Sequence, residues 1–180
     1  MPILRLVAPD SLVLRTPTPR MTDRLTRADH RVIGDMKMTL GAIPDAIAIA
    51  GPQVGVRMRV FVVRSNPEID VIIDPTITWT SAMDEGDVIL GPNNEPIPRI
   101  ASLWERCLSF PGEEFLVTRP HIVTIRFRNE KGVGRKASYQ GWPARVVLHE
   151  IAHLDGLVVR DRAQATRPVP ENDQNQTGSF

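Results

Sequence analysis

The segment 146–156 constrains the fold of this chain most strongly, because two histidines stand four residues apart within an apolar run. In an α-helix successive side chains advance by about 100°, so His149 and His153 would lie on one face, one turn apart. Pro143 is suited to the first turn of such a helix. The sequence therefore predicts a C-terminal helix with both imidazoles on the same face.

The same segment suggests a metal site. Two imidazoles one turn apart can share a metal ion, and Glu150, beside the first of them, could reach a water on that metal without being a ligand itself. This is the His-Glu-x-x-His arrangement of metallohydrolases. The alternative is a structural helix that happens to carry two histidines, because the motif also occurs in unrelated helices.

The composition is typical of one globular domain. A chain of 180 residues that is 42% hydrophobic and 24% charged can bury a sizeable core. Its net charge of +1 and its dispersed arginines indicate neither DNA nor another polyanion as a partner. No apolar run reaches about 18 residues and the N-terminus lacks the pattern of a secretory signal, so we expect no membrane association and a cytoplasmic protein. Residues 1–162 are expected to form the domain, and residues 163–180, which lack apolar periodicity, a flexible tail.

The order of the predicted elements indicates the α+β class, because strands precede a single long C-terminal helix instead of alternating with helices. Apolar residues at helical spacing predict one further helix over residues 26–41, with Thr26 or Asp29 as its N-cap. The segment 81–99 is rich in turn residues and should be a loop with at most a brief strand at 88–90. The predicted strands cover residues 3–7, 59–63, 70–73, 77–80, 121–128 and 133–139, the last two as a hairpin.

Two other segments carry residues that could serve a site. Residues 46–55 are mostly small and apolar, which suits either a buried strand or a strand edge that a substrate backbone can approach closely. Gln53 is the lone amide there, and a buried amide needs hydrogen-bond partners or a ligand. Cys107 is the single cysteine, so it could be core filler, a reactive thiol or a metal ligand. A thiolate with two imidazoles is a plausible donor set for a catalytic metal whose fourth position is left to water.

Taken together, three segments resemble the sequence motifs of peptide deformylases. Glu105-Arg106-Cys107-Leu108-Ser109 resembles the E-G-C-L-S motif, residues 46–53 resemble G-x-G-x-A-A-x-Q, and residues 149–153 resemble H-E-x-D-H. They occur in the family's order and at comparable spacing, and the resemblance extends over roughly residues 3–160. It implies the family's α+β fold, in which antiparallel β-sheets surround the metal-binding C-terminal helix.

The resemblance implies an enzyme that removes the formyl group from the N-terminal formyl-methionine of nascent bacterial or organellar proteins. Cys107, His149 and His153 would bind one divalent metal ion, expected to be Fe²⁺ in the cell, with Zn²⁺, Ni²⁺ or Co²⁺ also accommodated. The expected partners are formylated peptide N-termini, including those of nascent chains at the ribosome. We expect a monomer or a weak dimer.

Further residue roles follow from the same resemblance. Glu150 would be the general base and acid. Gln53 and the backbone N–H of Leu108 would face the oxygen of the formyl carbonyl. These residue types suit the reaction, because amide hydrolysis needs a group that transfers a proton and fixed donors for the developing oxyanion.

The resemblance also implies where the peptide binds. The peptide would lie as an added strand against Ile47 and Ala48. Its methionine side chain would enter an apolar pocket formed in part by Ile47, Trp142 and Val146. Arg106, next to a predicted metal ligand, could narrow the cleft or recruit an acidic group of the substrate.

The chain departs from the family motifs at several positions. The departures are Ala46 and Ala48 for two glycines, Gly51 for an alanine, Arg106 for a glycine, Leu148 for a glutamine, Ala152 for an aspartate, and Glu114 where many bacterial members have an arginine near the substrate. None of them removes a metal ligand, the general base or the oxyanion donor, so we expect metal binding and hydrolysis to survive. Two alternatives stay open. One is a divergent paralogue that hydrolyses another N-formyl or amide substrate, and the other is a non-catalytic module that binds metal or peptide.

Overall fold

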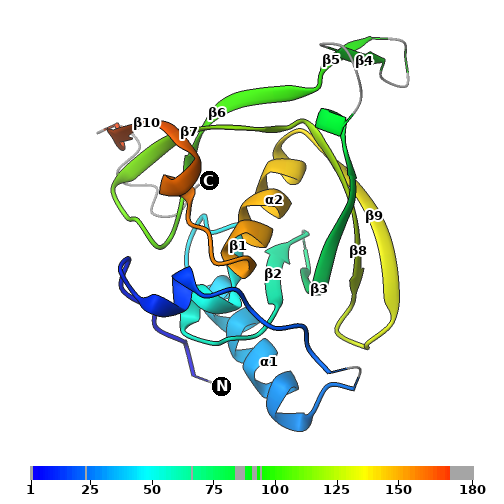
Figure 1. Ribbon diagram of the computed structural model, residues 1–180. Helices are drawn as coiled ribbons and strands as arrows, with labels where there is room; N and C mark the ends of the chain where they lie inside the picture. The colour runs from blue at the N-terminus through cyan, green and yellow to red at the C-terminus, as the bar shows by residue number, and fades with distance from the viewer. Residues whose placement is uncertain are drawn as a thin grey trace.

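Helix α2 (Trp142–Leu154) lies at the centre of the molecule, with strands on several sides (Figure 1). The structure is a computed structural model that describes residues 2–22, 24–65, 67–83, 88–90, 93 and 95–170. All of residues 144–154 are buried. Gly141 precedes the helix with φ of 64°, and Gly156 follows it with φ of 75°, where an added Cβ would lie 2.9 Å from the backbone nitrogen of Pro17. The predicted C-terminal helix is therefore confirmed, and its two ends are fixed by glycine conformations.

A five-stranded antiparallel sheet packs against this helix. Its strand order is β1-β2-β3-β8-β9, and every neighbouring pair is antiparallel. The apolar residues Phe61, Ile72 and Ile125 of the sheet form one core cluster with Val147 and Ile151 of α2. The bounds of the strands are β1 Ala48–Ala50, β2 Val60–Arg64, β3 Ile69–Thr80, β8 Ile122–Arg128 and β9 Gly134–Gln140. The predicted strands at 59–63, 70–73 and 77–80 and the hairpin 121–139 are thus confirmed, and residues 74–76 join two of them into β3.

A three-stranded antiparallel sheet of order β10-β7-β6 passes over the other side of α2. Its strands are β6 (Ile100–Arg106), β7 (Glu113–Pro120) and β10 (Ala163–Pro168). The prediction of a flexible tail from residue 163 is wrong for residues 163–168, because their backbone pairs with β7 and Val169 then donates to the carbonyl of Gly112 at 3.0 Å. The rest of that predicted tail, residues 171–180, lies outside the described residues.

Helix α1 (Arg27–Ala42) covers the β1–β2 end of the larger sheet, as the second core cluster shows. Thr26 is its N-cap, and the Thr26 side chain and the Asp29 side chain each bind the other's backbone N–H, so the predicted helix is confirmed and Thr26 is the cap. The predicted strand at 3–7 is wrong, since these residues have no strand pairing. Their backbone binds elsewhere, with Leu4 donating to Thr39 Oγ1 at 2.9 Å and Val7 to the Gln53 carbonyl at 2.9 Å.

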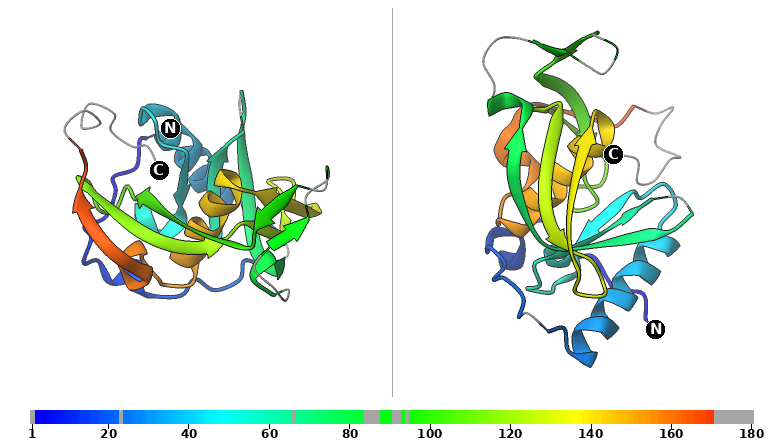
Figure 2. Two further views of the ribbon diagram at one scale, coloured as in Figure 1. Left: turned by 90° about the horizontal axis from the view of Figure 1, so that it is seen from above. Right: turned by 90° about the vertical axis from the view of Figure 1, so that its right-hand side faces the viewer.

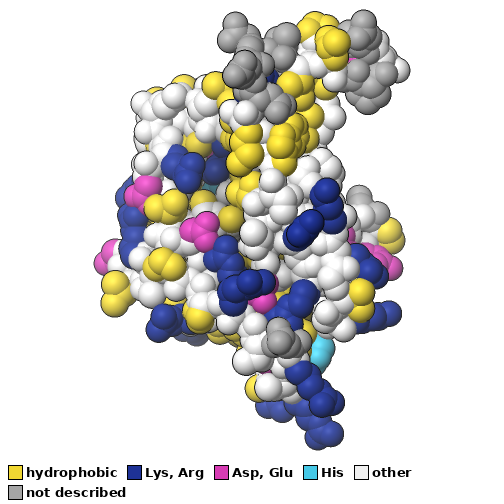
Figure 3. Space-filling view, turned by 45° about the vertical axis from the view of Figure 1, so that its right-hand side comes forward, with side chains coloured by type: hydrophobic (Ala, Val, Ile, Leu, Met, Phe, Trp, Pro, Cys, Tyr) yellow, Lys and Arg dark blue, Asp and Glu magenta, His cyan; other side chains and the backbone are white. Residues whose placement is uncertain are grey.

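The remaining elements are short. Figure 2 shows α1 at the opposite end of the molecule from the small hairpin formed by β4 (Val88–Leu90) and β5 (Pro96–Pro98). The 3₁₀ turns are η1 Leu12–Arg15, η2 Gly51–Val54, η3 Ser81–Met83 and η4 Val159–Arg162. On the face in Figure 3, Lys and Arg side chains lie in several separate groups, and hydrophobic side chains gather toward the β4–β5 end. Among the described residues, neither α-helix has the length and apolarity that a bilayer crossing requires.

Candidate metal centre

Three possible metal ligands from distant parts of the chain meet inside the protein. Cys107 directly follows β6, and His149 and His153 lie one turn apart on α2. One ligand atom from each residue lies within 4.8 Å of the other two, and Cys107 Sγ is 3.3 Å from His153 Nε2. All three side chains are buried. One soft sulfur and two imidazole nitrogens in this arrangement fit a single Zn²⁺ or Fe²⁺ ion with a position to spare.

A buried carboxylate orients the first histidine. Glu105 Oε2 lies 3.1 Å from His149 Nδ1, and Glu105 also accepts two hydrogen bonds from Arg119 at 2.6 and 2.8 Å. Arg145 adds a contact of 2.5 Å to Oε1 and donates to the carbonyls of Val117 and Ala101. Because Nδ1 of His149 is engaged by the carboxylate, Nε2 is the nitrogen that this ring can offer to a metal.

The protonation states around the ligands follow from burial and charge. Burial alone would raise the pKa of Glu105, but hydrogen bonds from His149 and Arg119 and the charge of Arg119 hold it well below its usual range. Burial lowers the pKa of both His149 and His153, so both rings are neutral, as metal ligation requires. Burial raises the pKa of the Cys107 thiol to about 12. A thiolate at this position therefore needs a cation beside it, which a bound divalent metal would supply.

Glu150 lies next to these ligands without a protein partner for either carboxyl oxygen within the described part of the chain. It is 0% exposed, and burial raises its pKa to about 8. A buried polar group without a partner calls for an explanation, and proton exchange with a bound water or substrate is one. A carboxyl group that titrates near neutral pH can both accept and return a proton.

Gln53 presents its amide nitrogen to the same site. Its Oε1 accepts from the backbone N–H of Ala50 at 2.8 Å, and its Nε2 donates to Ser109 Oγ at 3.3 Å and lies 3.7 Å from Cys107 Sγ. Leu108 follows Cys107 in a turn that the hydrogen bond from Phe110 N to the Cys107 carbonyl closes at 2.9 Å. The structure thus brings the side chain of Gln53 beside the ligand residue that precedes Leu108.

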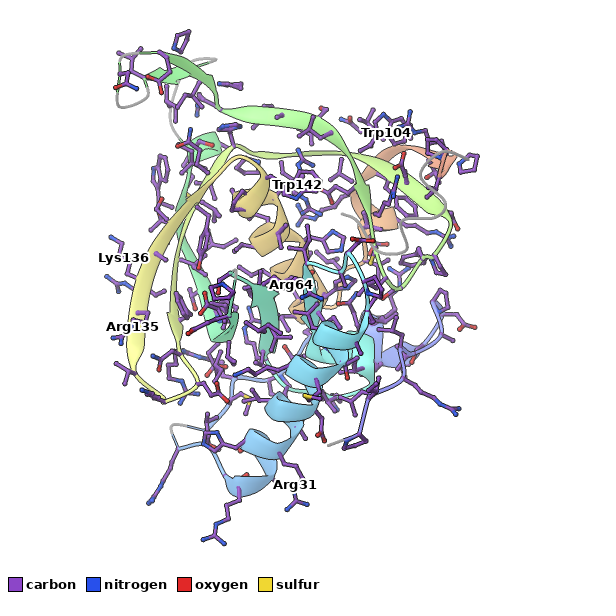
Figure 4. The ribbon with its side chains drawn as sticks, turned by 180° about the vertical axis from the view of Figure 1, so that it is seen from behind. Arg31, Arg64, Trp104, Arg135, Lys136 and Trp142 are labelled. Atoms are coloured by element: carbon purple, nitrogen blue, oxygen red, sulfur yellow. The ribbon has the colours of Figure 1, made fainter. Side chains whose placement is uncertain are left out.

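The predicted substrate-binding residues lie on different elements. Ala48 belongs to β1, which is an edge strand of the larger sheet, and half-buried Ile47 precedes it. Trp142 and Val146 belong to the first turns of α2, and Figure 4 shows Trp142 at the N-terminal end of the helix. An edge strand can accept an added peptide strand. The shared pocket of Ile47, Trp142 and Val146 stays a prediction.

Arg106 is already engaged by a protein carboxylate. Its Nε donates to Glu114 Oε1 at 2.8 Å, and the two residues face each other across the β6–β7 pair. Glu114 also accepts from Arg167 of β10 at 2.8 Å. Two departures from the family motifs are therefore neighbours that bind each other.

The other departures are apolar or small residues in buried places. Ala46 and Ala48 are 0% exposed, and Leu148 and Ala152 are 9% exposed. A Cβ on Gly51 would lie 2.7 Å from the carbonyl oxygen of Met58, so the backbone approaches this glycine too closely for an alanine.

The sequence alone does not single out the residues that support the candidate ligands. Arg145 and His149 are four residues apart on α2, so a charged residue on the ligand face was a usable signal. Arg119, Ser109 and Arg167 reach the site through strand pairing and turns that the sequence does not reveal.

Comparison with known proteins gives one consistent result. The family model for polypeptide deformylase matches residues 2–169. Peptide deformylase of Natranaerobius thermophilus is 34% identical over 168 residues, which cover 91% of this chain and 94% of that protein. Peptide deformylase 1 of Streptomyces coelicolor is 33% identical over 136 residues, which cover 75% of this chain but 61% of that protein, less than two thirds of its length. The crystal structure of a peptide deformylase from Synechococcus elongatus, in complex with actinonin, is similar with a TM-score of 0.75 and 29% identity, covering 97% of this chain and 84% of that one.

Proposed function

Because the chain belongs to the polypeptide deformylase family, we propose that it hydrolyses the formyl group from the N-terminal formyl-methionine of nascent polypeptides. The observation that carries this proposal is the meeting of Cys107, His149 and His153 within 4.8 Å beside the buried carboxyl group of Glu150. Formate and a free N-terminal amine would be the products. We further propose that the reaction takes place in the cytoplasm, on peptides that are still being synthesised.

The three ligand residues would hold one divalent metal ion, and we propose Fe²⁺ as that ion in the cell. The donor set supports a transition metal, since thiolate and imidazole are ligands that Fe²⁺ and Zn²⁺ accept. When bound, the cation would act as a Lewis acid and could lower the pKa of water to about 7.

The protein's own groups would then carry the proton and stabilise the oxyanion. Glu150 would take the proton of the attacking water and deliver it to the departing amine nitrogen, a role supported by its burial beside the three proposed ligands and by its carboxyl oxygens, which have no partner among the described residues. The Nε2 of Gln53, which its bond to Ala50 orients, and the backbone N–H of Leu108 would donate to the formyl oxygen as negative charge develops there.

The substrate backbone would extend along the free edge of β1, against Ile47 and Ala48. This proposal is supported by the strand order, because β1 pairs only with β2 in its sheet as the described residues show it. The methionine side chain would enter the space near Trp142 and Val146. A formyl group is the smallest acyl group, so the buried surroundings of the ligands would exclude larger ones.

Formate release from formyl-Met-Ala-Ser tests the proposal. The protein should be purified without oxygen in the presence of Fe²⁺, with the metal content measured on the same sample. We expect turnover of the formylated peptide and none of acetyl-Met-Ala-Ser. Glu150→Gln should keep the metal and lose about 10²–10⁴ in rate, as removal of a general base does. Stoichiometric metal without release of formate from several formyl-methionyl peptides would exclude this function.

A further inference from the structure

One row of charged side chains crosses the smaller sheet beside the proposed metal centre. Glu114 of β7 accepts from Arg106 Nε of β6 at 2.8 Å and, through its other carboxyl oxygen, from Arg167 Nε of β10 at 2.8 Å. The three residues are also register partners, Arg106 opposite Glu114 and Glu114 opposite Arg167. The Glu114 and Arg106 side chains are 8% and 14% exposed, so water competes little for their bond, whereas the Arg167 side chain is 45% exposed and remains partly solvated.

This row closes the turn that carries the cysteine. Arg106 directly precedes Cys107, and Glu114 is its cross-strand partner on the return strand, so the two residues lie at the ends of the segment that contains the ligand. The turn is held a second time by Val169, whose N–H donates to the Gly112 carbonyl at 3.0 Å. Val169 itself is 8% exposed.

Residues 159–169, which we call the C-terminal strap, contact this turn and the adjoining strands at more than one point. The Arg167 guanidinium lies 4.0 Å from the centroid of the Trp104 ring, and Figure 4 shows Trp104 beside β10. Arg160 forms an ion pair with Glu113 and lies 4.5 Å from the centroid of the Phe110 ring. A cation over an aromatic face is attracted to it and is held in a narrow range of positions.

The two histidines proposed as ligands lie on a different element from this strap. His149 and His153 belong to helix α2, whose residues 144–154 are all buried, and Glu105 Oε2 lies 3.1 Å from Nδ1 of His149. Cys107, by contrast, lies in a turn outside any helix or strand. We propose that Arg167 of the C-terminal strap is a positioning residue, which acts through Glu114 and Arg106 to hold Cys107 where it can complete the metal site. This inference rests on the proposed function, because it takes Cys107 as a metal ligand.

Substitution of Arg167 by methionine tests the proposal, because methionine retains an apolar chain for Trp104 but loses the guanidinium. The dissociation constant for Zn²⁺ should be measured by competition with a chelator, and the absorption of the Co²⁺ protein should be recorded for its thiolate-to-metal band. We expect about tenfold weaker Zn²⁺ binding, the lower end for residues that support a ligand, and a weaker thiolate band. Arg167→Lys keeps a cation for Glu114 and should recover most of the affinity.

A second readout needs no metal. Cys107 is the single cysteine and is 3% exposed. Its rate of reaction with a thiol reagent in the metal-free protein therefore reports opening of its turn, without a contribution from bound metal. We expect Arg167→Met to react about five to ten times faster than the wild type. Arg135→Met is the matched control, since it removes an arginine from β9, away from Trp104 and β10, and it should leave both readouts unchanged (Figure 4).

The outcomes separate this inference from the proposed function. Glu114→Gln, which keeps the volume but removes the charge, should change the two readouts in the same direction, and it serves if Arg167→Met does not fold. Wild-type Zn²⁺ affinity and thiol reactivity in both variants would overturn the positioning role while leaving the deformylase proposal intact. If Arg167→Met weakens Zn²⁺ binding and speeds the thiol reaction as expected, but the wild-type protein with bound metal releases no formate, the inference is upheld and the activity is refuted. An equal change in Arg135→Met would also overturn the inference.

Discussion

Gly51→Ala, which introduces the residue of the family motif at this position, should lower both the stability and the activity of this protein. Gly51 opens the 3₁₀ turn η2, which carries Gln53. A Cβ added there would lie 2.7 Å from the carbonyl oxygen of Met58, 3.1 Å from that of Val56 and 3.3 Å from Val56 Cγ2. The first two contacts are with backbone atoms, which cannot rotate away as a side chain could, so the turn and its neighbour must move apart.

The size of the effect follows from these distances. Extra atoms forced into a well-packed region typically cost about 1–3 kcal/mol, and for a domain of this size that lowers Tm by about 2–12 °C. Because η2 also sets the position of the Gln53 amide, a shift of part of an ångström should reduce kcat/KM for formyl-Met-Ala-Ser by about 10–10². The metal content should not change, since the three proposed ligands lie on other elements.

The opposite sign is expected at a second glycine. Gly41 lies in the last turn of α1, and an added Cβ there would meet nothing within 4 Å. Gly41→Ala should therefore raise stability by up to about 1 kcal/mol through helix propensity. Thermal unfolding of both variants, followed by circular dichroism, measures the contrast. A Gly51→Ala protein with the Tm of the wild type, or with higher activity, would refute the argument that the Met58 carbonyl sets the residue at position 51.

The remaining predictions concern the buried site. Glu105→Gln should weaken Zn²⁺ binding by about 10–100-fold and lower the free energy of unfolding by about 3–5 kcal/mol, because it leaves Arg119 and Arg145 buried without their carboxylate; chelator competition and urea unfolding measure the two effects. The pKa of Glu105 is depressed in the folded protein, so its stabilising contribution is complete above 4.5, the ordinary pKa of a glutamate, and is lost as pH falls below that value; urea unfolding across acidic pH should show this loss in the wild type and a flatter profile in Glu105→Gln. Gln53→Leu should reduce kcat by about 10²–10³ with unchanged metal content, as loss of an oxyanion donor does, and an equal kcat would remove Gln53 from the mechanism. Bound metal should stabilise the protein by an amount that grows with the free metal concentration, about 2.7 kcal/mol at 100 times the dissociation constant. Removal of the metal with a chelator should therefore lower Tm, and calorimetry with and without Zn²⁺ checks it.

The sequence predicts the parts of the fold whose residues are apolar at regular spacing. Helices α1 and α2 and the strands of the larger sheet show such spacing, and their existence and type are confirmed. Apolar spacing does not predict strands β6 and β7, because some of their buried positions hold charged residues, Glu105 and Arg119 among them. A charged residue normally indicates an exposed position, and only a partner from another part of the chain makes its burial possible. Strand β10 is largely exposed and has no apolar alternation, so nothing in its own composition predicts that it pairs with β7.

The site shows the same division between local and distant information. The motif segments name the candidate ligands, and the helical period alone places His149 and His153 on one face. The sequence does not show that Glu105 reaches His149, because that contact depends on how β6 packs against α2. Nor does it show which serine or arginine lies near Gln53 and Cys107.

The two departures at positions 106 and 114 illustrate what pairing changes. An arginine next to a metal ligand, considered alone, adds a positive charge that would oppose a bound cation and could attract an acidic substrate. In the structure Arg106 faces Glu114 across the strand pair, and the carboxylate offsets this charge within 2.8 Å. The second arginine on Glu114 comes from β10, a segment that the sequence presents as a tail. Arg106 and Glu114 therefore have to be considered together, as an internal ion pair whose second arginine comes from β10.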